Sequence, residues 1–585
     1  MKFLSNVLAV IVGLLIFWVL AFFFIAGLIA IGSADDKIKI SENTVLHLKL
    51  NNVNVVERTP DDDLDFSSIS SFAGISSVGL NQILKAIDTA KDNDNIKGIY
   101  LESGTVLAGQ SHIVEIRSAL KRFQEAGKFI VSYSEYYTEA GYFLCSVADE
   151  IYMNPLGELE FNGFASEAVF VKGLLEKIEV EPVIFRVGEF KSAIEPFILD
   201  KMSEENRIQT AEFLTEMNEV MVESISESRD IPASELKNIN DQMLIRTSQD
   251  ALDHGLIDNL WYDDQVKDRL REKLGLEEDD DIKSINITRI NKTATSKNRL
   301  SRNRIAVVVA DGNIISGQSE EEISSEYFLK EIRKARKNKD VKAIVMRINS
   351  PGGSILASEV IWRELSEAQK EKPLIASMSN LAASGGYYIA VPADTIVAQP
   401  NTITGSIGIF GLWFNAQGLL NNKLGITTDV VKTGQYSDFL TPTRKITEGE
   451  RAIMQRKVEE GYETFIKRVS DSRGMSKDEV IAVAGGRVWT GTRAKENGLV
   501  DILGNLDDAI QIAAVKAGVE EDFRTVYYPE QKSFLERLIS EFTKDVQATY
   551  ARIKFGQSYE LFKSLERLKK LEGVMAIMPF EIEIK

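Results

Sequence analysis

Ser384 has the setting best suited to nucleophilic chemistry. It stands in the segment Ala-Ala-Ser-Gly-Gly-Tyr-Tyr, soon after an apolar run over 374–378 that predicts a buried strand. A sharp turn from that strand into a helix would present the serine hydroxyl, and the next backbone N–H, from Gly385, would lie beside any oxyanion that forms. The competing interpretation is an ordinary helix N-cap, which is a common position for serine.

A nucleophilic serine needs a base, and the sequence favours a lysine. The chain has 3 histidines, and none lies in a glycine-rich or turn motif near Ser384 in the sequence, so a histidine triad is disfavoured. The candidate is Lys191, in the segment Gly188–Pro196. At the usual lysine pKa of about 10.4, only about one amine in 2,500 is neutral at pH 7, so burial would have to lower this pKa. Phe190 and Phe197 could form apolar walls; the alternative is a solvated surface lysine.

A glycine-rich turn, Asn349–Ser354, follows a second predicted strand and precedes a helical segment over 355–369. Paired glycines let backbone N–H groups approach an oxygen closely, and a helix amino end favours negative charge. The turn therefore suits an oxyanion hole, with the choice between Gly352 and Gly353 left open. It does not match the phosphate-binding loop, because the lysine of that motif is missing. A purely structural turn is the alternative.

The chain contains an internal repeat, which gives the domain organisation. Lys-Gly-Ile-Tyr-Leu at 97–101 aligns with Lys-Ala-Ile-Val-Met at 342–346, and the same displacement of 245 residues aligns further segments. We predict two copies of one domain, over 42–265 and 303–526. A polar, charge-rich linker over 266–302 is expected to join them.

The two copies carry complementary chemical groups. Ser384 aligns with Glu139 of the first copy, and Lys191 aligns with Ser437 of the second after an offset of one residue. The first copy thus has a lysine without a nucleophile, whereas the second has the serine and the glycines without a lysine. One composite site per chain is the simplest interpretation. This complementarity favours catalysis over the structural alternatives.

Short apolar runs that alternate with amphipathic segments predict the elements that must position these groups. The run over 343–346 indicates a buried strand, and long helices are predicted near 204–227 and 448–472. Strands alternating with helices predict an α/β fold with largely parallel pairing. The tail over 527–585 is expected to be helical.

The amino terminus predicts a transmembrane anchor over 1–36. Residues 7–31 are all apolar or glycine, which gives a helix about 37 Å long against a hydrocarbon core of about 30 Å. A cleavable signal peptide has a shorter apolar region and is the alternative. Lys2 precedes the run, and Asp35 and Asp36 follow it. The positive-inside rule then puts the body outside the cytoplasm, on the periplasmic side of the inner membrane in a two-membrane bacterium.

Composition limits the remaining function classes. The 585 residues include 69 Lys and Arg against 87 Asp and Glu, a net charge of −18 that argues against non-specific nucleic-acid binding. The single cysteine, Cys145, excludes an internal disulfide and any zinc site that needs two thiolates. We expect no metal and no other cofactor.

The residues carrying these patterns resemble one family over nearly the whole chain. The family is signal peptide peptidase A, also called protease IV, in its long tandem-domain form, and it belongs to the Clp-protease/crotonase fold group. The most specific matches are Asn349–Gly353, Ala383–Tyr388, Thr404–Gly408, Gly486–Gly491 and the segment Lys191–Phe197. The resemblance implies two tandem Clp-protease/crotonase-like domains, with an N-terminal transmembrane helix and a helical C-terminal tail.

The resemblance also implies roles for individual residues. Ser384 would be the nucleophile and Lys191 the general base, while Ser406 would help to hold the lysine amine. Gly353 and Gly385 would donate the oxyanion-hole N–H groups. The family forms membrane-anchored homotetramers that degrade hydrophobic peptides, above all signal peptides left in the membrane after export.

Two other functions remain open at this point. A crotonase-like acyl-CoA enzyme would use the same type of oxyanion hole, but the export anchor argues against it, because CoA thioesters are cytoplasmic. A non-enzymatic membrane scaffold on a protease fold is the second alternative. The presence of both Ser384 and Lys191 argues against that alternative.

Overall fold

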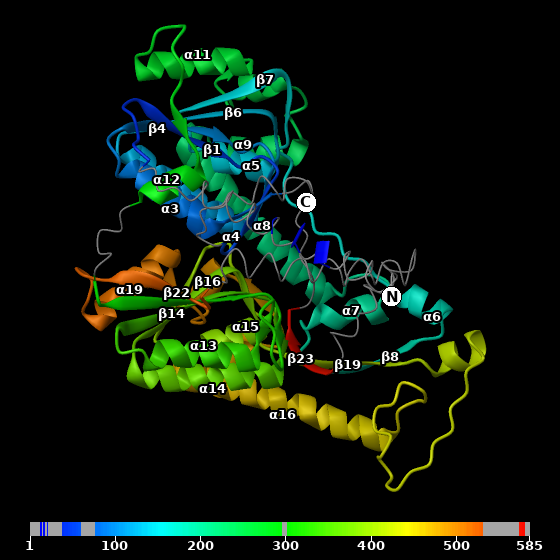
Figure 1. Ribbon diagram of the computed structural model, residues 1–585. Coiled ribbons are helices and arrows are strands. Elements are labelled where there is room, and N and C mark those ends of the chain that lie inside the picture. The colour runs from blue at the N-terminus through cyan, green and yellow to red at the C-terminus, as the bar shows by residue number, and fades with distance from the viewer. Residues whose placement is uncertain are drawn as a thin grey trace, which may run out of the picture.

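The computed structural model describes residues 38–59, 76–294, 301–530 and 573–578, together with residues 12–13, 16–17 and 20. The described chain forms two α/β halves, and in Figure 1 the first half lies above the second. A mixed α/β architecture built on an internal repeat, as the sequence predicts, is therefore observed.

The first half is built on a six-stranded parallel sheet. Its strands, in spatial order, are β10 (Ser284–Ile285), β1 (Thr44–Lys49), β4 (Ile96–Glu102), β6 (Phe129–Tyr137), β7 (Glu150–Leu159) and β9 (Asn259–Leu260). The helices of this half are α3 (Leu80–Lys91), α4 (Gln110–Glu125), α5 (Glu139–Cys145), α6 (Lys172–Lys177), α7 (Glu195–Ile198), α8 (Glu204–Arg229), α9 (Ala233–Gln242), α10 (Ser248–Asp253), α11 (Asp263–Leu274) and α12 (Ile287–Thr293). A small sheet of β3 (Ser76–Gly79), β2 (Val53–Val56) and β5 (Val106–Leu107) adjoins it.

The second half repeats this order around an eight-stranded sheet. Its main strands, in spatial order, are β20 (Val488–Thr490), β18 (Ile403–Gly405), β16 (Leu374–Ala383), β14 (Val341–Ser350), β11 (Arg304–Asp311) and β22 (Arg524–Tyr528). The strand β17 (Thr395–Ala398) also pairs with β16, and β21 (Ile502–Leu503) pairs with β17. Its helices are α13 (Ser325–Lys337), α14 (Ile355–Glu371), α15 (Gly385–Ala390), α16 (Glu448–Arg473), α17 (Lys477–Val483), α18 (Gly491–Glu496) and α19 (Leu506–Ala517). The strands β14 and β16 are almost wholly buried, which explains why they read as continuous apolar runs.

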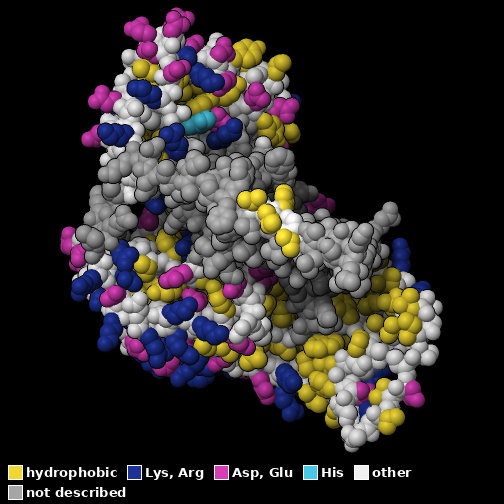
Figure 2. Space-filling model, in the orientation of Figure 1, with side chains coloured by type: hydrophobic (Ala, Val, Ile, Leu, Met, Phe, Trp, Pro, Cys, Tyr) yellow, Lys and Arg dark blue, Asp and Glu magenta, His cyan; other side chains and the backbone are white. Residues whose placement is uncertain are grey.

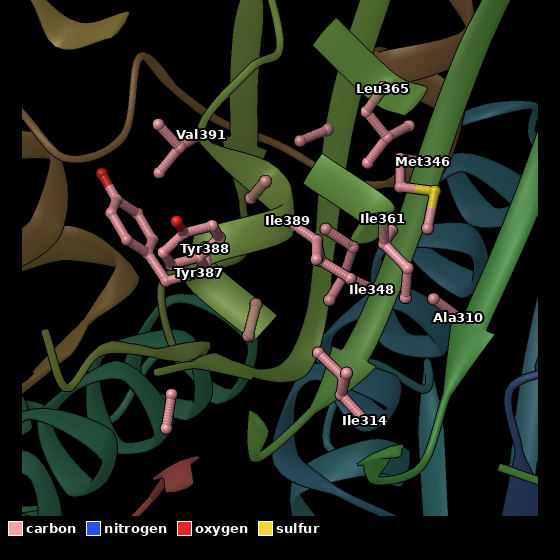
Figure 3. Packing of buried hydrophobic residues seen from close by; sticks show 14 of the residues in the cluster. Ala310, Ile314, Met346, Ile348, Ile361, Leu365, Tyr387, Tyr388, Ile389 and Val391 are labelled. Atoms are coloured by element: carbon pink, nitrogen blue, oxygen red, sulfur yellow. The ribbon is translucent and has the colours of Figure 1, made fainter. Parts of the chain in front are cut away.

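The core of the second half lies where α14 and α15 pack against β14 and β11. Figure 3 shows Ile361 and Leu365 of α14 beside Met346 and Ile348 of β14, with Tyr387 and Tyr388 of α15 close by. All six of these side chains are buried. This packing fixes the start of α15, and hence the position of Ser384, against the sheet.

A third sheet draws strands from both halves and from the carboxyl-terminal region. In spatial order it contains β13 (Ile323–Ser324), β12 (Ile314–Ile315), β15 (Gly352–Ser354), β23 (Gly573–Ile577), β19 (Ile409–Asn415) and β8 (Glu181–Val187). The strand β8 leads directly into the segment that carries Lys191, and β15 is part of the predicted oxyanion turn. This sheet therefore joins the two halves at the residues of chemical interest.

A buried ion network also holds the two halves together. The Arg347 guanidinium of β14 donates to Glu57 at 2.9 Å and to Glu115 at 3.0 Å, and all three side chains are buried. Burial disfavours the charged Glu57, yet the charges of Arg347 and His112 hold the pKa of this carboxyl well below its usual range. Asn380 of β16 adds a second polar tie, because its side-chain oxygen accepts from the Ser111 N–H at the start of α4.

The predicted linker over 266–302 is largely part of the first domain. The helix α11 packs on the first sheet through Val266 and Leu270, and β10 pairs with β1 to form the edge of that sheet. These elements match α19 and β22 of the second half, so the first repeat runs on to about residue 285. The apolar residues of α11 recur at every fourth position among charged ones. Because most residues of the segment are charged, its composition predicts a linker rather than this packed helix.

The predicted helical tail over 527–585 differs from the structure wherever the structure describes it. Residues 527–528 complete β22, and residues 573–577 form the strand β23. The helical segment expected over 533–571 lies outside the described residues. The predicted anchor over 1–36 also lies outside them, except for the five helical positions named above. Among the described residues, no helix has the length and hydropathy required to cross a membrane.

Candidate active site

Ser384 lies at the turn between β16 and α15, as the sequence predicts. Its backbone has a positive φ of 54° with ψ of −114°, a combination that L-residues rarely adopt, and its side chain makes no capping hydrogen bond to the helix. The helix N-cap interpretation is thus not what the structure shows. A serine held in a rarely adopted conformation stores strain, typically about 1–3 kcal/mol, which is common where a side chain must be aimed at a partner.

Lys191 reaches Ser384 from the first half. The Lys191 Nζ lies 2.9 Å from the Ser384 Oγ, although 193 positions separate the two residues in the chain. Both side chains are fully buried. Burial alone drives the pKa of Lys191 well below its usual value, because no carboxylate compensates the ammonium charge. The neutral amine, which can accept a proton, is therefore favoured.

Ser406 completes the polar surroundings of the lysine amine. The Lys191 Nζ donates to the Ser406 Oγ at 2.9 Å and to the Ser406 carbonyl oxygen at 3.1 Å. Ser406 is itself left-handed, with φ of 49°, and it is fully buried. Two fixed oxygens of one residue thus orient the amine toward Ser384.

Two glycines of the second half, Gly485 and Gly486, contact the segment 190–192 that carries Lys191, here called the lysine loop. A Cβ on Gly486 would lie 2.7 Å from both the Cβ and the backbone nitrogen of Lys191, so only glycine permits this approach. The Phe190 N–H donates to the Gly485 carbonyl at 3.0 Å. The glycine pair is visible in the sequence but has no recognisable role there, because the contact joins segments almost 300 positions apart.

The helix α8 supports the same loop from behind. The Gln209 side chain donates to the Phe190 carbonyl at 3.3 Å and to the Ser192 Oγ at 3.0 Å. Its oxygen accepts from the Val488 N–H at 3.2 Å, so one buried glutamine holds the lysine loop and β20 together. Sequence reasoning missed Gln209, since a lone glutamine in a charged helix carries no local signal.

The predicted oxyanion turn lies against the start of α15. A Cβ on Gly352 would come within 2.6 Å of the Gly385 nitrogen, which shows how closely the two backbones approach. The Gly352 N–H donates to the Ser350 Oγ at 3.2 Å. Gly353 follows with φ of 154°, a conformation that glycine adopts easily. Ser384, Lys191 and Ser406 thus form one buried cluster, and the turn that carries Gly353 lies against Gly385 beside it.

The other candidate groups lie elsewhere. His47 and His112 pair with Glu102 and Glu57 at 2.9 Å and 2.8 Å. Ser437, the sequence counterpart of Lys191, lies in an exposed segment. Burial raises the pKa of the Cys145 thiol to about 12, so it is not a nucleophile at neutral pH. Within the described ranges, no group of three or more His, Cys, Asp or Glu could hold a metal ion.

Comparison with known proteins agrees with this arrangement. The profile of peptidase family S49 matches residues 122–277 and 366–520, one stretch in each half. "Protease 4" of Salmonella typhi is 36% identical over 80% of this chain and 77% of its own length. "Protease 4" of Haemophilus influenzae is 34% identical over 80% and 78%, and "Serine protease SPPA, chloroplastic" of Arabidopsis thaliana is 32% identical over 76% and 66%.

These similarities define the class of the protein, which is a serine peptidase. The chain belongs to peptidase family S49, with one family repeat in each half. The family resemblance drawn from the sequence is confirmed, and the acyl-CoA enzyme and scaffold alternatives give way to it.

Proposed function

We propose that the protein hydrolyses peptide bonds with a dyad of Ser384 and Lys191, one residue from each half. The observation that carries this proposal is the 2.9 Å separation between Lys191 Nζ and Ser384 Oγ inside a fully buried cluster. A buried neutral amine is a competent base, and it lies within the distance that proton transfer requires.

In this mechanism Ser384 Oγ attacks the peptide carbonyl carbon while Lys191 Nζ takes the hydroxyl proton. The same amine, now an ammonium, delivers that proton to the leaving amine as the peptide C–N bond breaks. Water then attacks the resulting ester, with Lys191 again as base, and releases the acid. Ser406 keeps the amine aimed at Ser384 through both steps.

The oxyanion would be stabilised by backbone N–H groups of Gly353 and Gly385. The Gly352 N–H is engaged by Ser350 Oγ, which leaves Gly353 as the donor that we assign in this turn. The position of Gly385, directly after the nucleophile at the start of α15, supports its assignment as the second donor.

We further propose that the substrates are hydrophobic peptides, most specifically signal peptides released during export. A relative from Enterococcus faecium, 37% identical over 35% of this chain, carries the name "Putative signal peptide peptidase SppA". Residues 7–31 would anchor the chain in the inner membrane, with the catalytic halves on the periplasmic side. Each repeat would belong to the Clp-protease/crotonase fold group, as the resemblance implies.

A homotetramer is part of the same proposal, and an exposed apolar arm supports it. The arm runs between β19 and α16 at the lower right of Figure 1, and Figure 2 shows hydrophobic side chains gathered at this end. Within it Leu424 is 59% and Val431 98% exposed, and Ile426 and Val430 are also exposed. Apolar patches of this kind commonly mark protein or membrane contacts.

The test of the dyad uses the full chain in detergent and a fluorogenic apolar peptide. Ser384→Ala and Lys191→Met are expected to lower kcat by at least about 1,000-fold while circular dichroism and oligomeric state stay unchanged. Substantial turnover by Lys191→Met would remove the lysine from the mechanism. Lys372→Met is the matched control, because burial also lowers the pKa of Lys372, to about 8, but its amine binds only backbone carbonyls of Ala335 and Asn338.

The pH dependence of the same reaction gives a second readout. Since burial lowers the pKa of Lys191, kcat/KM should already be high at neutral pH and should fall as acid protonates the amine. A profile that instead rises only near pH 10, where exposed lysines titrate, would contradict the proposed role.

A further inference from the structure

Arg487 contacts two aromatic rings, one from each half of the molecule. Its guanidinium carbon lies over the Phe190 ring, 5.0 Å from the centroid, and over the Trp489 ring, 4.2 Å from the centroid. Both separations are within the range of about 6 Å over which a cation is attracted to an aromatic face. Phe190 belongs to the lysine loop and Trp489 to β20, so this side chain connects the two halves beside the dyad.

The Trp489 ring has a fixed place next to the backbone that holds Ser384. Its indole N–H donates to the Val483 carbonyl at 2.9 Å. A Cβ on Gly405 would lie 2.8 Å from Cδ1 of the Trp489 ring, so the ring packs directly on the backbone of β18. The Gly405 carbonyl accepts from the Ser384 N–H at 2.8 Å. One ring in contact with Arg487 is therefore tied to the backbone of the nucleophile.

The Phe190 ring belongs to a segment that has little regular structure. Phe190 and Lys191 lie between β8 and a short 3-10 helix that begins at Ser192. The Phe190 N–H donates to the Gly485 carbonyl at 3.0 Å, and the Ser192 N–H donates to the Phe190 carbonyl at 2.9 Å. A segment with few backbone hydrogen bonds depends on its side chains for a fixed position. The contact between Phe190 and Arg487 therefore affects where Lys191 points.

The main chain of Arg487 contacts the third member of the buried cluster. Its carbonyl oxygen accepts from the Ser406 N–H at 2.7 Å, in the turn where Ser406 has a positive φ of 49°. The Ser406 Oγ in turn accepts from the Lys191 amine at 2.9 Å. A movement of Arg487 would thus disturb both the loop that carries the amine and the residue that orients it.

A carboxylate of α8 pairs with the same guanidinium. The Arg487 Nη2 donates to Glu212, and the two side chains are 24% and 47% exposed. Glu216, one turn further along α8, pairs with Arg493 in the same way. Ion pairs of this exposure contribute little by themselves. Among the described contacts, only Arg487 of the two arginines also meets aromatic rings, and this is the feature that sets it apart.

We infer that Arg487 is a positioning residue, which stacks against Phe190 and Trp489 and so fixes the lysine loop. The loop is then held where the Lys191 Nζ lies within hydrogen-bond distance of the Ser384 Oγ. The inference rests on the proposed function, since it takes these two groups to be the base and the nucleophile. Arg487 acts through its neighbours and takes no part in the bond changes.

The first experiment removes the guanidinium and keeps a side chain of similar length. In Arg487→Met, kcat for the fluorogenic apolar peptide should fall by about 10- to 100-fold, because displacing a catalytic group by about 1 Å has an effect of this order. KM should change by less than about threefold, since the base acts after the peptide has bound. Arg493→Met is the matched control and should keep kcat within about twofold of the parent chain. Equal losses in the two variants, or no loss in Arg487→Met, would overturn the inference.

The pH profile distinguishes positioning from a general loss of folded protein. A loosened lysine loop lets water reach the amine, which removes part of the burial that lowers the pKa of Lys191. The acid limb of kcat/KM should therefore move to higher pH in Arg487→Met, by about half a pH unit or more, and should not move in Arg493→Met. A loss of the same size at every pH would indicate fewer folded molecules and would overturn the inference.

A double-variant cycle tests whether the ring of Phe190 transmits the effect, and its first member also serves if Arg487→Met does not fold. Phe190→Leu should lower kcat about as much as Arg487→Met does. The two changes together should cost at most about threefold more than either change alone, because they remove the same contact. Losses that multiply in the double variant would overturn the inference, since Arg487 would then act by another route.

Hydrogen exchange, read by mass spectrometry, separates this inference from the proposed function. The amides of Phe190 and Ser192 should exchange at least about tenfold faster in Arg487→Met than in the parent chain, and at the parent rate in Arg493→Met. If that difference is found but the parent chain hydrolyses no peptide, the positioning role stands and the proposed catalysis fails. If the parent chain hydrolyses peptides but Arg487→Met changes neither exchange nor kcat, the catalysis stands and the inference fails.

Discussion

The two halves of the molecule build the same strand–turn–helix and use it differently. In the second half the residue before α15, Ser384, has a positive φ of 54°, and its side chain makes no capping hydrogen bond to the helix. In the first half the residue before α5, Thr138, has φ of −68° and accepts from the Gly141 N–H, as an ordinary N-cap does. The turn of the first half is relaxed, and the turn of the second is strained.

The hydrogen bonds around the two turns also differ, because those of the first half stay within that half. Thr138 donates its side-chain hydroxyl to the Gly104 carbonyl, and its backbone N–H donates there as well, so this turn is closed by its own hydrogen bonds. Glu139, the sequence counterpart of Ser384, is buried and accepts from the Gly163 N–H and the Asn240 amide. The comparison indicates that duplication preserved the scaffold, while strain persisted only where a side chain must meet a partner from the other half.

The largest effect is expected where the halves are tied together. Arg347→Met would leave Glu115 buried without its cation and Glu57 with His112 alone, and losses of this kind cost about 3–5 kcal/mol. Urea unfolding followed by circular dichroism measures the loss. Arg333→Met is the control, because its partner Glu364 lies in the same half and the Arg333 side chain is 47% exposed, so about 1 kcal/mol or less is expected. An equal loss of unfolding free energy in the two variants would contradict a special role for the buried ion network of Arg347.

A smaller effect is expected at Gly486, the residue of the second half that contacts the backbone of Lys191. Gly486→Ala would push Lys191 away through a contact of 2.7 Å and should lower kcat/KM by about 100-fold, the usual result of displacing a catalytic group by about 1 Å. Gly485→Ala is matched to it, since both glycines are left-handed, with φ of 65° and 83°, but nothing lies within 4 Å of a Cβ at 485. If both variants lose similar activity, the cause is backbone strain at the glycines and not displacement of Lys191.

The smallest effect is expected at the relaxed turn of the first half. Burial raises the pKa of Glu139 to about 7 from the ordinary 4.5, so the folded state binds the extra proton between these values and stability falls as pH rises through them. Glu139→Gln keeps both accepted hydrogen bonds without a charge. It should therefore be more stable than the parent chain by about 1–2 kcal/mol at pH 8 and no more stable at pH 4.

Hydrolysis should be unchanged in Glu139→Gln, because this turn carries no part of the proposed chemistry. The exposed Glu135 of β6, the strand that precedes this turn, provides the control, since Glu135→Gln should shift neither stability nor activity. A loss of activity in Glu139→Gln would show that the two turns are less different than the comparison indicates.

Local signals explain what could be predicted from the sequence. The glycine turn at 349–354 and the Ser384 segment can each be recognised from consecutive residues, and the repeat from short matching segments. These patterns predict the α/β fold and the family, and both predictions are confirmed. The meeting of Lys191 with Ser384 followed from the complementary groups of the two copies, and the structure brings these side chains together. Their catalytic roles, the anchor and the tetramer stay predictions.

The remaining features depend on contacts between distant segments. The fit of Gly486 against Lys191 and the pairing of β23 with β15 each join parts of the chain more than 200 positions apart, and neither has a local pattern. The sequence predicts too short a first repeat, because the apolar residues of α11 stand among charged ones. Whether a short segment such as β23 forms a strand likewise depends on the strands it pairs with more than on its own residues.

The long separation between Lys191 and Ser384 has a consequence for biosynthesis. A ribosome completes the lysine-bearing half first, so a growing or broken chain holds an amine with nothing to activate. Cleavage becomes feasible only after the later half has been made and has docked. If Ser384 and Lys191 act as the proposed dyad, the chain therefore stays inactive until its own assembly is finished.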